Sequence, residues 1–148
     1  MNVDYPSLHK RIVALCASES DEIAKMATIA CELFHSDMRF DWVGFYRVTA
    51  PEVLKIGPYQ GGHGCLTIPF SRGVCGAVAR SGKTQIVKDV NAFAGHIACA
   101  ASTRSEIVLP VFRATELIAV LDIDSNQADA FNKNDAEYLQ KILANIFT

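Results

Sequence analysis

The stretch EIVLPVFRATELIAVLDID, which runs from Glu106 to Asp124, decides the fold of this chain. It contains two runs rich in aliphatic and β-branched residues, 106–112 and 117–124, separated by a short polar segment, 113–116. Runs of this length and composition predict strands, and the segment between them predicts a hairpin turn. We therefore expect an antiparallel sheet that contains this hairpin.

A further strand is predicted upstream, where side chains alternate with a period of two. Trp42, Gly44 and Tyr46 share one face of this strand, and Val43 and Phe45 point to the other. The segments that follow are, in order, a turn at Pro51, a returning strand over 53–56, a glycine-rich loop over 57–64 and a short strand over 66–70.

Helical segments flank these strands. Apolar residues recur there with the spacing of one helix face, and capping residues stand near the segment starts. The expected helices cover 6–18, 20–34, 74–80 and a last segment that starts near Asn132, whereas 88–103 is expected to be an irregular loop. A loop of that length is typical of functional or mobile segments. Together these elements predict an α+β sandwich, an antiparallel sheet with helices packed on it.

Length and charge limit the classes of function. With 148 residues the chain is expected to form one domain, 1–148. A net charge of −2 gives no basic footprint for nucleic acid and no polybasic patch for a membrane. The N-terminus lacks the basic start and apolar core of a signal peptide, and no apolar run approaches the roughly 20 residues of a membrane span. We therefore expect a cytoplasmic protein without a nucleic-acid or membrane partner.

The five cysteines include no Cys-x-x-Cys pair, which fits individually used thiols in a reducing compartment. Cys16 and Cys31 fall in predicted helices and are interpreted as packing residues. Cys65, Cys75 and Cys99 lie in glycine-containing segments that read as turns. A single cysteine of this kind favours a buried packing role, but three in neighbouring loop-like segments favour a reactive thiol, with Cys99 as candidate nucleophile.

The same three cysteines, together with His63 and His96, are also candidate zinc ligands. Structural zinc sites in proteins have two cysteines spaced as Cys-x2–4-Cys, and this spacing is absent. We therefore do not expect a metal site.

Acidic residues stand at the end of the hairpin that decides the fold. Asp122 and Asp124 are two residues apart on one predicted strand, so their side chains share a face. Glu106 begins the preceding strand and could lie across from them. Carboxyl groups that share a pocket repel one another when all are ionised, so the pKa of one of them should rise. That group would then be a proton donor near neutral pH. The alternative is a solvated strand end followed by an ordinary turn, and the spacing leaves both open.

Trp42 and Tyr46 could form the wall of a small binding site. They share one strand face, and Gly44 between them is expected to leave room for a ligand to approach the backbone. The alternative is that both rings pack in the core.

Together these segments resemble the free methionine-(R)-sulfoxide reductase family, whose members are built on a GAF domain. The resemblance covers nearly the whole chain, and its three-cysteine pattern is specific to this family rather than to GAF domains at large. It rests on 41–46 (DWVGFY), 57–61 (GPYQG), Cys65 followed by Ile68-Pro69, 73–76 (GVCG), 95–99 (GHIAC), 105–110 (SEIVLP) and 120–125 (VLDIDS).

The resemblance implies a fold and a role for each thiol. The fold is a GAF-like, six-stranded antiparallel sheet flanked by helices, commonly assembled as a homodimer. Cys99 would attack the sulfur of free methionine sulfoxide, and Cys65 would resolve the product as a disulfide. Cys75 would be an auxiliary thiol. Thioredoxin or a similar dithiol would regenerate the enzyme, and no metal or organic cofactor would be needed.

The resemblance also assigns the remaining site residues. Glu106, Asp122 and Asp124 would hold the sulfoxide oxygen and the substrate, and Trp42 and Tyr46 would surround its methyl group.

The chain departs from the family pattern at two places. Ala100 stands where Asp is common, and His63-Gly64 replaces a pair that usually contains Lys. These differences concern the polar surroundings of Cys99 and the segment that carries Cys65. The alternative function is a sensory GAF module that binds a small ligand or senses redox state. Such a sensor is normally fused to an output domain, for which this sequence has no room.

Overall fold

The structure, a computed structural model, describes residues 3–96, 99 and 101–148. Helices in this part of the chain are α1 (Tyr5–Cys16), α2 (Glu22–Phe34), α3 (Gly73–Ser81), α4 (Lys133–Ile146) and a short 3-10 turn, η1 (Val90–Ala92). Its strands are β1 (Trp42–Ala50), β2 (Val53–Gln60), β3 (Thr67–Pro69), β4 (Gln85–Val87), β5 (Ser105–Arg113) and β6 (Glu116–Ser125). The predicted α+β class is confirmed.

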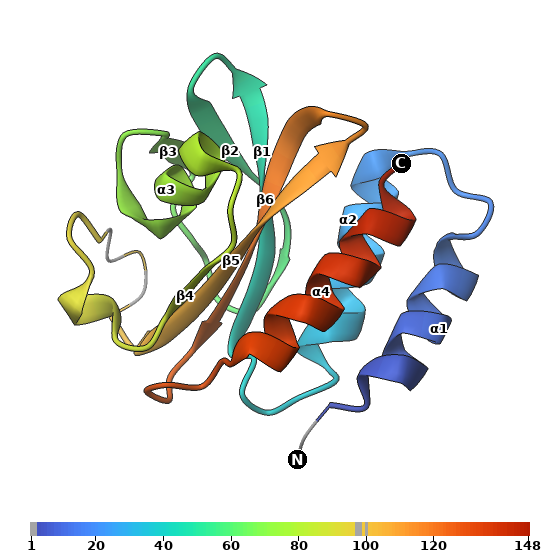
Figure 1. The fold of residues 1–148 in the computed structure, drawn as a ribbon, viewed down its shortest axis with the longest axis horizontal. Helices are drawn as coiled ribbons and strands as arrows, with labels where there is room; N and C mark the ends of the chain where they lie inside the picture. The colour runs from blue at the N-terminus through green and yellow to red at the C-terminus, as the bar shows by residue number, and fades with distance from the viewer. Residues whose placement is uncertain (1–2, 97–98, 100) are drawn as a thin grey trace.

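The strands form one antiparallel sheet in the order β3-β2-β1-β6-β5-β4 (Figure 1). The predicted hairpin is present, because β5 and β6 pair from Ser105–Ser125 to Arg113–Glu116. Its turn includes Ala114, whose φ of 54° lies in the left-handed region that tight hairpins use. Since β6 also pairs with β1, the two predicted hairpins lie side by side in the middle of the sheet.

The two faces of the sheet are covered differently. Helices α1, α2 and α4 lie on one face and α3 lies on the other (Figure 1). The larger core, between the sheet and the three helices, includes Ile12, Ile29, Phe45, Leu121 and Leu139. The smaller core under α3 includes Val78, Val108 and Val120. None of the helices in the described ranges is long and apolar enough to cross a membrane.

Strand β2 is longer than the sequence predicted. Residues 57–60 continue the strand, so the expected glycine-rich loop over 57–64 is wrong for its first half. The register changes between Gly44–Tyr59 and Tyr46–Ile56, so Gly57 and Pro58 together oppose the single residue Phe45. This β-bulge accommodates a glycine and a proline that would otherwise indicate a break in the strand.

The long segment between α3 and β5 is also more regular than expected. It contains β4, a three-residue edge strand that pairs with β5, and η1 within the range 88–103. The segment is held by the Val90 N–H, which donates to the Arg104 carbonyl at 2.9 Å, and by the Asp129 N–H, which donates to the Lys88 carbonyl at 2.9 Å. Strand β4 was missed because three residues are too few to show a period.

A buried charge network ties α1 and α4 to the segment before β1. Asp135 accepts hydrogen bonds from the Tyr5 hydroxyl at 2.6 Å and from the Arg39 guanidinium at 3.0 Å. Arg39 also pairs with the buried Asp37 at 2.9 Å. The side chains of Asn132 and Asp135 exchange hydrogen bonds with each other's backbone N–H, which forms a capping box at the start of α4.

We predict that Asp135→Ala lowers the free energy of unfolding by about 2–4 kcal/mol at pH 7, measured by urea denaturation. The variant loses the capping box and the Tyr5 hydrogen bond, and it removes one of two carboxylates paired with Arg39. The exposed Glu137 on the same helix is the matched control. Glu137→Ala should change stability by less than about 0.5 kcal/mol.

The effect should depend on pH. Burial opposes ionisation of Asp135, but hydrogen bonds from Arg39 and Tyr5 outweigh it and lower the pKa of this carboxyl. A lowered native pKa stabilises the fold above the unfolded-chain value of about 3.9, and this contribution is lost as the pH falls through the native value. The difference between wild type and Asp135→Ala should therefore narrow below about pH 4. A difference that stays constant under acid would contradict the assigned ion pair.

Candidate active site

Three carboxyl groups gather at one end of the central strands. Cross-strand pairing places Glu106 of β5 directly opposite Asp124 of β6, and Asp122 lies two residues earlier on the same face of β6. On the other side of β6, Asp124 pairs with Trp42 and Asp122 pairs with Gly44 of β1. The register of the sheet thus brings the three acids and the aromatic strand together.

The carboxyl cluster is largely buried. Glu106 and Asp122 are 6% and 5% exposed, which excludes the alternative of a solvated strand end, and Asp124 is half-buried. One side-chain oxygen of Asp122 and one of Asp124 are buried without a hydrogen-bond partner among the described residues. Burial, reinforced by the charge of neighbouring carboxyl groups, raises the pKa of both aspartates well above the usual value. The cluster therefore contains a candidate proton donor for neutral pH.

Trp42 and Tyr46 lie beside the carboxyl cluster, with their rings stacked at a centroid distance of 5.8 Å. The indole Nε1 donates to the Gly62 carbonyl at 2.7 Å, and Tyr59 of β2 stacks on the indole at 5.3 Å. Burial, followed by the charge of Asp122, raises the pKa of Tyr46, so its hydroxyl stays protonated. Tyr59 has no predicted role, because the glycine and proline before it indicate a loop over 57–64 and not a strand that places its ring on the indole.

The expectation that Gly44 leaves room for a ligand is wrong. A Cβ atom at this position would lie 2.6 Å from Cζ3 of Trp42 and 2.6 Å from Cβ of Tyr59. The indole and the Tyr59 side chain therefore fill the space, and glycine is required by their close packing on β1.

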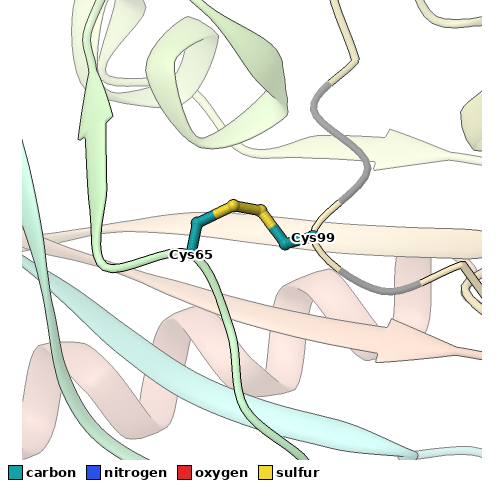
Figure 2. Close-up of a disulfide and its surroundings, with 2 residues drawn as sticks. All are labelled: Cys65 and Cys99. Atoms are coloured by element: carbon teal, nitrogen blue, oxygen red, sulfur yellow. A yellow bond between two sulfur atoms is a disulfide. The ribbon is translucent and has the colours of Figure 1, made fainter.

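Figure 2 shows a disulfide between Cys65, in the segment before β3, and Cys99, in the segment before β5. The two Cα atoms are 5.4 Å apart, within the range for a bridge. The Cys65 side is fixed by Gly64, where a Cβ would lie 3.0 Å from both the Trp42 ring and the Tyr46 hydroxyl. The pairing implied by the family resemblance is therefore present, and the residue before Cys65 lies against the aromatic pair.

Cys75 lies in the first turn of α3, as the helix expected over 74–80 implies, and not in a glycine-containing turn. It is 4% exposed and carries no disulfide. Its sulfur and one oxygen each of Glu106 and Asp122 all lie within 4.8 Å of one another. Burial, followed by the charge of Asp122, raises the pKa of the Cys75 thiol well above the usual value, so the thiol is protonated and unreactive.

These groups line one small hollow. Its volume is about 40 Å³, which is room for roughly three water molecules. The lining contains every catalytic or substrate-binding residue expected from the sequence except Cys65. Cys99, the disulfide partner of Cys65, belongs to the lining. The lining also contains His63 and His96, which the sequence indicates only as candidate zinc ligands. Its remaining residues, which have no predicted role at this site, are Gly64, Ile68, Gly73, Val74 and Thr103.

The segment that carries Cys99 is attached to α3. The Gly73 N–H at the start of this helix donates to the Gly95 carbonyl at 3.0 Å, and the His96 N–H donates to the Phe93 carbonyl at 3.2 Å. Gly95 has a φ of 80°, which glycine adopts without strain. Ala100, the first departure from the family pattern, lies outside the described residues, as do Ile97 and Ala98.

Comparison with known proteins adds an independent line of argument. A family model described as "GAF domain" matches residues 16–146. The chain is 37% identical to the free methionine-R-sulfoxide reductase of Escherichia coli (strain K12), over 96% of this chain and 86% of that protein. The free methionine-R-sulfoxide reductase of Neisseria meningitidis, solved in complex with its substrate, is similar with 39% identity and a TM-score of 0.91, over 96% and 85% of the two chains. The reduced form of fRMsr of Staphylococcus aureus is similar with 39% identity and a TM-score of 0.94, over 99% and 94%.

We predict a specific pattern of thiol accessibility for the oxidised protein. Under denaturing conditions without reductant, alkylation should label Cys16, Cys31 and Cys75, and reduction should add Cys65 and Cys99. In the native oxidised protein Cys31 should react first, because it is the half-buried free thiol, whereas Cys16 and Cys75 are buried and burial raises their pKa. Peptide mass spectrometry measures each site. Labelling of native Cys75 as fast as Cys31 would contradict its burial.

Proposed function

This chain belongs to the free methionine-R-sulfoxide reductase family of GAF-domain proteins, and we propose that it reduces free L-methionine-(R)-sulfoxide to L-methionine. The observation that carries the proposal is the Cys65–Cys99 disulfide, which lies at a hollow lined by buried carboxyl groups. A thiol pair beside a proton donor is the combination that sulfoxide reduction requires.

The first step is the attack of the Cys99 thiolate on the substrate sulfur. The sulfoxide oxygen leaves poorly unless it is protonated, and Asp124 or Asp122 supplies the proton because burial keeps one of them protonated near neutral pH. The protonated oxygen is then transferred as hydroxyl from the methionine sulfur to Sγ of Cys99, and the sulfur–sulfur bond formed in the attack breaks. The products of this step are free methionine and a sulfenic acid at Cys99.

The second step protects that sulfenic acid. The Cys65 thiol condenses with it, so that a sulfur–sulfur bond forms and the oxygen leaves as water. A Cα separation of 5.4 Å between these residues in the disulfide form supports this pairing. The disulfide forms before further oxidation of Cys99 to an irreversible acid can occur.

The third step restores the two thiols. An external dithiol attacks the disulfide, is itself oxidised, and leaves Cys65 and Cys99 reduced. Thioredoxin, with a potential of about −270 mV, is the reductant we propose. A cytoplasmic location remains a prediction from the sequence, and a homodimer remains one from the family resemblance.

The surroundings of the hollow support a small, free substrate. Trp42 and Tyr46 form an apolar wall for the methyl group, and the carboxyl groups of Glu106, Asp122 and Asp124 lie beside them in the lining of the same hollow. In the disulfide form the hollow holds only a few water molecules, so the substrate enters after reduction separates Cys65 from Cys99. A hollow of about 40 Å³ is too small to hold a peptide chain on both sides of the reacting side chain. We therefore propose that the amino acid must be free.

A coupled assay tests this function. With thioredoxin, its reductase and NADPH, the wild type should turn over free methionine-R-sulfoxide and should leave the S form and a peptide-bound form unreacted. Cys99→Ser should abolish turnover. Cys65→Ser should release about one methionine per enzyme and then stop, because no resolving thiol is left.

The matched control is Cys31→Ser, a half-buried thiol on α2 that should keep wild-type turnover. Turnover retained in Cys99→Ser would show that another residue attacks the sulfur. Normal multiple turnover in Cys65→Ser would remove its resolving role. A wild type that is inactive on every sulfoxide would favour the sensory GAF module instead.

The role of the carboxyl cluster is tested by Asp124→Asn. We predict that the single-turnover rate of methionine release falls by at least about 100-fold, because the amide cannot protonate the leaving oxygen. Since burial raises the pKa of Asp124, the wild-type rate should fall at alkaline pH as this donor ionises, and the variant should lose that dependence. Rapid-quench measurement on pre-reduced enzyme gives both results.

The control is Asp129→Asn, an exposed acid beyond β6 at a positive φ that asparagine tolerates. Its single-turnover rate should equal that of the wild type. An unchanged rate in Asp124→Asn would exclude this group as the proton source.

A further inference from the structure

Cys75 is a buried thiol for which the proposed reaction has no step. It does not lie in a purely apolar environment, as a packing cysteine would, because its sulfur is within 4.8 Å of carboxyl oxygens from Glu106 and Asp122. These three ligand atoms come from three different elements, α3, β5 and β6. The set is a thiol and two carboxyl groups that converge on one point of the hollow.

A second observation points to a ligand at this position. Asp122 is only 5% exposed and lines the hollow. Its Oδ1 atom has no hydrogen-bond partner in the described part of the chain. The half-buried Asp124, which follows two residues later, also has an unpartnered buried oxygen. Unpartnered buried carboxyl oxygens are costly, and a cation that accepts their lone pairs removes this cost.

The potential ligand atoms around the hollow favour a cation. Its described lining contains three carboxyl groups and the Cys75 thiol but neither lysine nor arginine, and its basic groups are His63 and His96. A hard ion such as Mg²⁺ prefers oxygen ligands and gains little from a thiolate. A thiolate with carboxylates instead suits a borderline-soft ion, above all Zn²⁺.

We propose that Cys75, Glu106 and Asp122 form a binding site for Zn²⁺ or a similar borderline-soft divalent cation. A zinc ion with bonds of about 2.3 Å to sulfur and about 2.1 Å to oxygen separates its ligands by about 3.4–3.6 Å, so the three atoms must approach by at most about 1.4 Å. Small side-chain rotations supply this movement. On binding, the S–H bond of Cys75 is replaced by a sulfur–zinc bond, and protons from the thiol and the carboxylic acid pass to solvent.

This site has a consequence for activity that rests on the proposed function. The metal would occupy the carboxyl groups that protonate and hold the substrate, so Zn²⁺ would inhibit reduction of methionine sulfoxide. Metal binding itself does not depend on the reaction. The oxidised protein, in which Cys65 and Cys99 form a disulfide and cannot act as thiolate ligands, should therefore bind the metal as well.

The test therefore uses the oxidised, metal-free protein and Co²⁺ as a spectroscopic probe for Zn²⁺. We expect one Co²⁺ per chain, a thiolate-to-cobalt charge-transfer band, and loss of this band when Zn²⁺ displaces the probe. Cys75→Ala should abolish the band and weaken Zn²⁺ binding in calorimetry by more than about tenfold. Asp122→Asn, which preserves shape but removes the charge, should also weaken it by more than about tenfold.

The matched control is Cys31→Ala, which removes a free thiol outside the proposed site, 3.8 Å from the Nδ1 atom of His35 and thus near another possible metal ligand. This variant should retain the band and the wild-type affinity. Absence of saturable binding to the wild type, a band that persists in Cys75→Ala, or a band that is lost in Cys31→Ala would each overturn the proposal. Failure of the sulfoxide assay with intact metal binding would overturn the proposed function alone.

Discussion

The burial of three carboxyl groups at one end of the β5–β6 hairpin is the constraint on which the site depends. A buried ionised carboxylate has lost its hydration. This free-energy cost is offset when a positive group pairs with the carboxylate, and it is avoided when the group is protonated. Elsewhere in the structure, the guanidinium of Arg39 forms salt bridges with the buried carboxylates of Asp37 and Asp135. No arginine or lysine in the described lining does this for the hollow. The carboxyl groups must therefore keep protons or attract a cation, and the proposed chemistry uses the first outcome while the proposed metal site uses the second.

The thiols are placed by the packing of segments rather than by the sheet itself. Gly64 lies against Trp42 and Tyr46 without space for a side chain, which fixes the segment that carries Cys65. The segment before Cys99 is attached to α3 through the backbone bond between Gly73 and Gly95. Breaking the disulfide therefore leaves each thiol tethered to a different part of the hollow's wall. In the proposed reaction, this arrangement would let the two sulfurs separate when substrate binds and pair again after the reduction step.

The sequence predicted those parts of the fold that depend on local periodicity. The central hairpin, the helices and the shared face of Asp122 and Asp124 all follow from residue spacing within one element. Gly57-Pro58 was misleading because both residues suit a loop as well as a bulge. The approach of Cys75 to Glu106 could not be predicted, because it depends on how far α3 lies from the sheet. Spacing alone therefore indicated no metal site, since the ligands belong to three elements.

The position of the acids is fixed by the opposite face of the same strands. Along β6, Leu121 and Ile123 point into the core beneath α1, α2 and α4 and are fully buried, while Asp122 and Asp124 alternate with them. A register slip by one residue would move both aspartates into that core and both aliphatic side chains into the hollow. The cost of that exchange holds the carboxyl groups in register opposite Glu106. The layer formed by α1, α2 and α4 contributes no residue to the hollow's described lining, yet packing against it sets the register that holds these carboxyl groups together on the other face of the sheet.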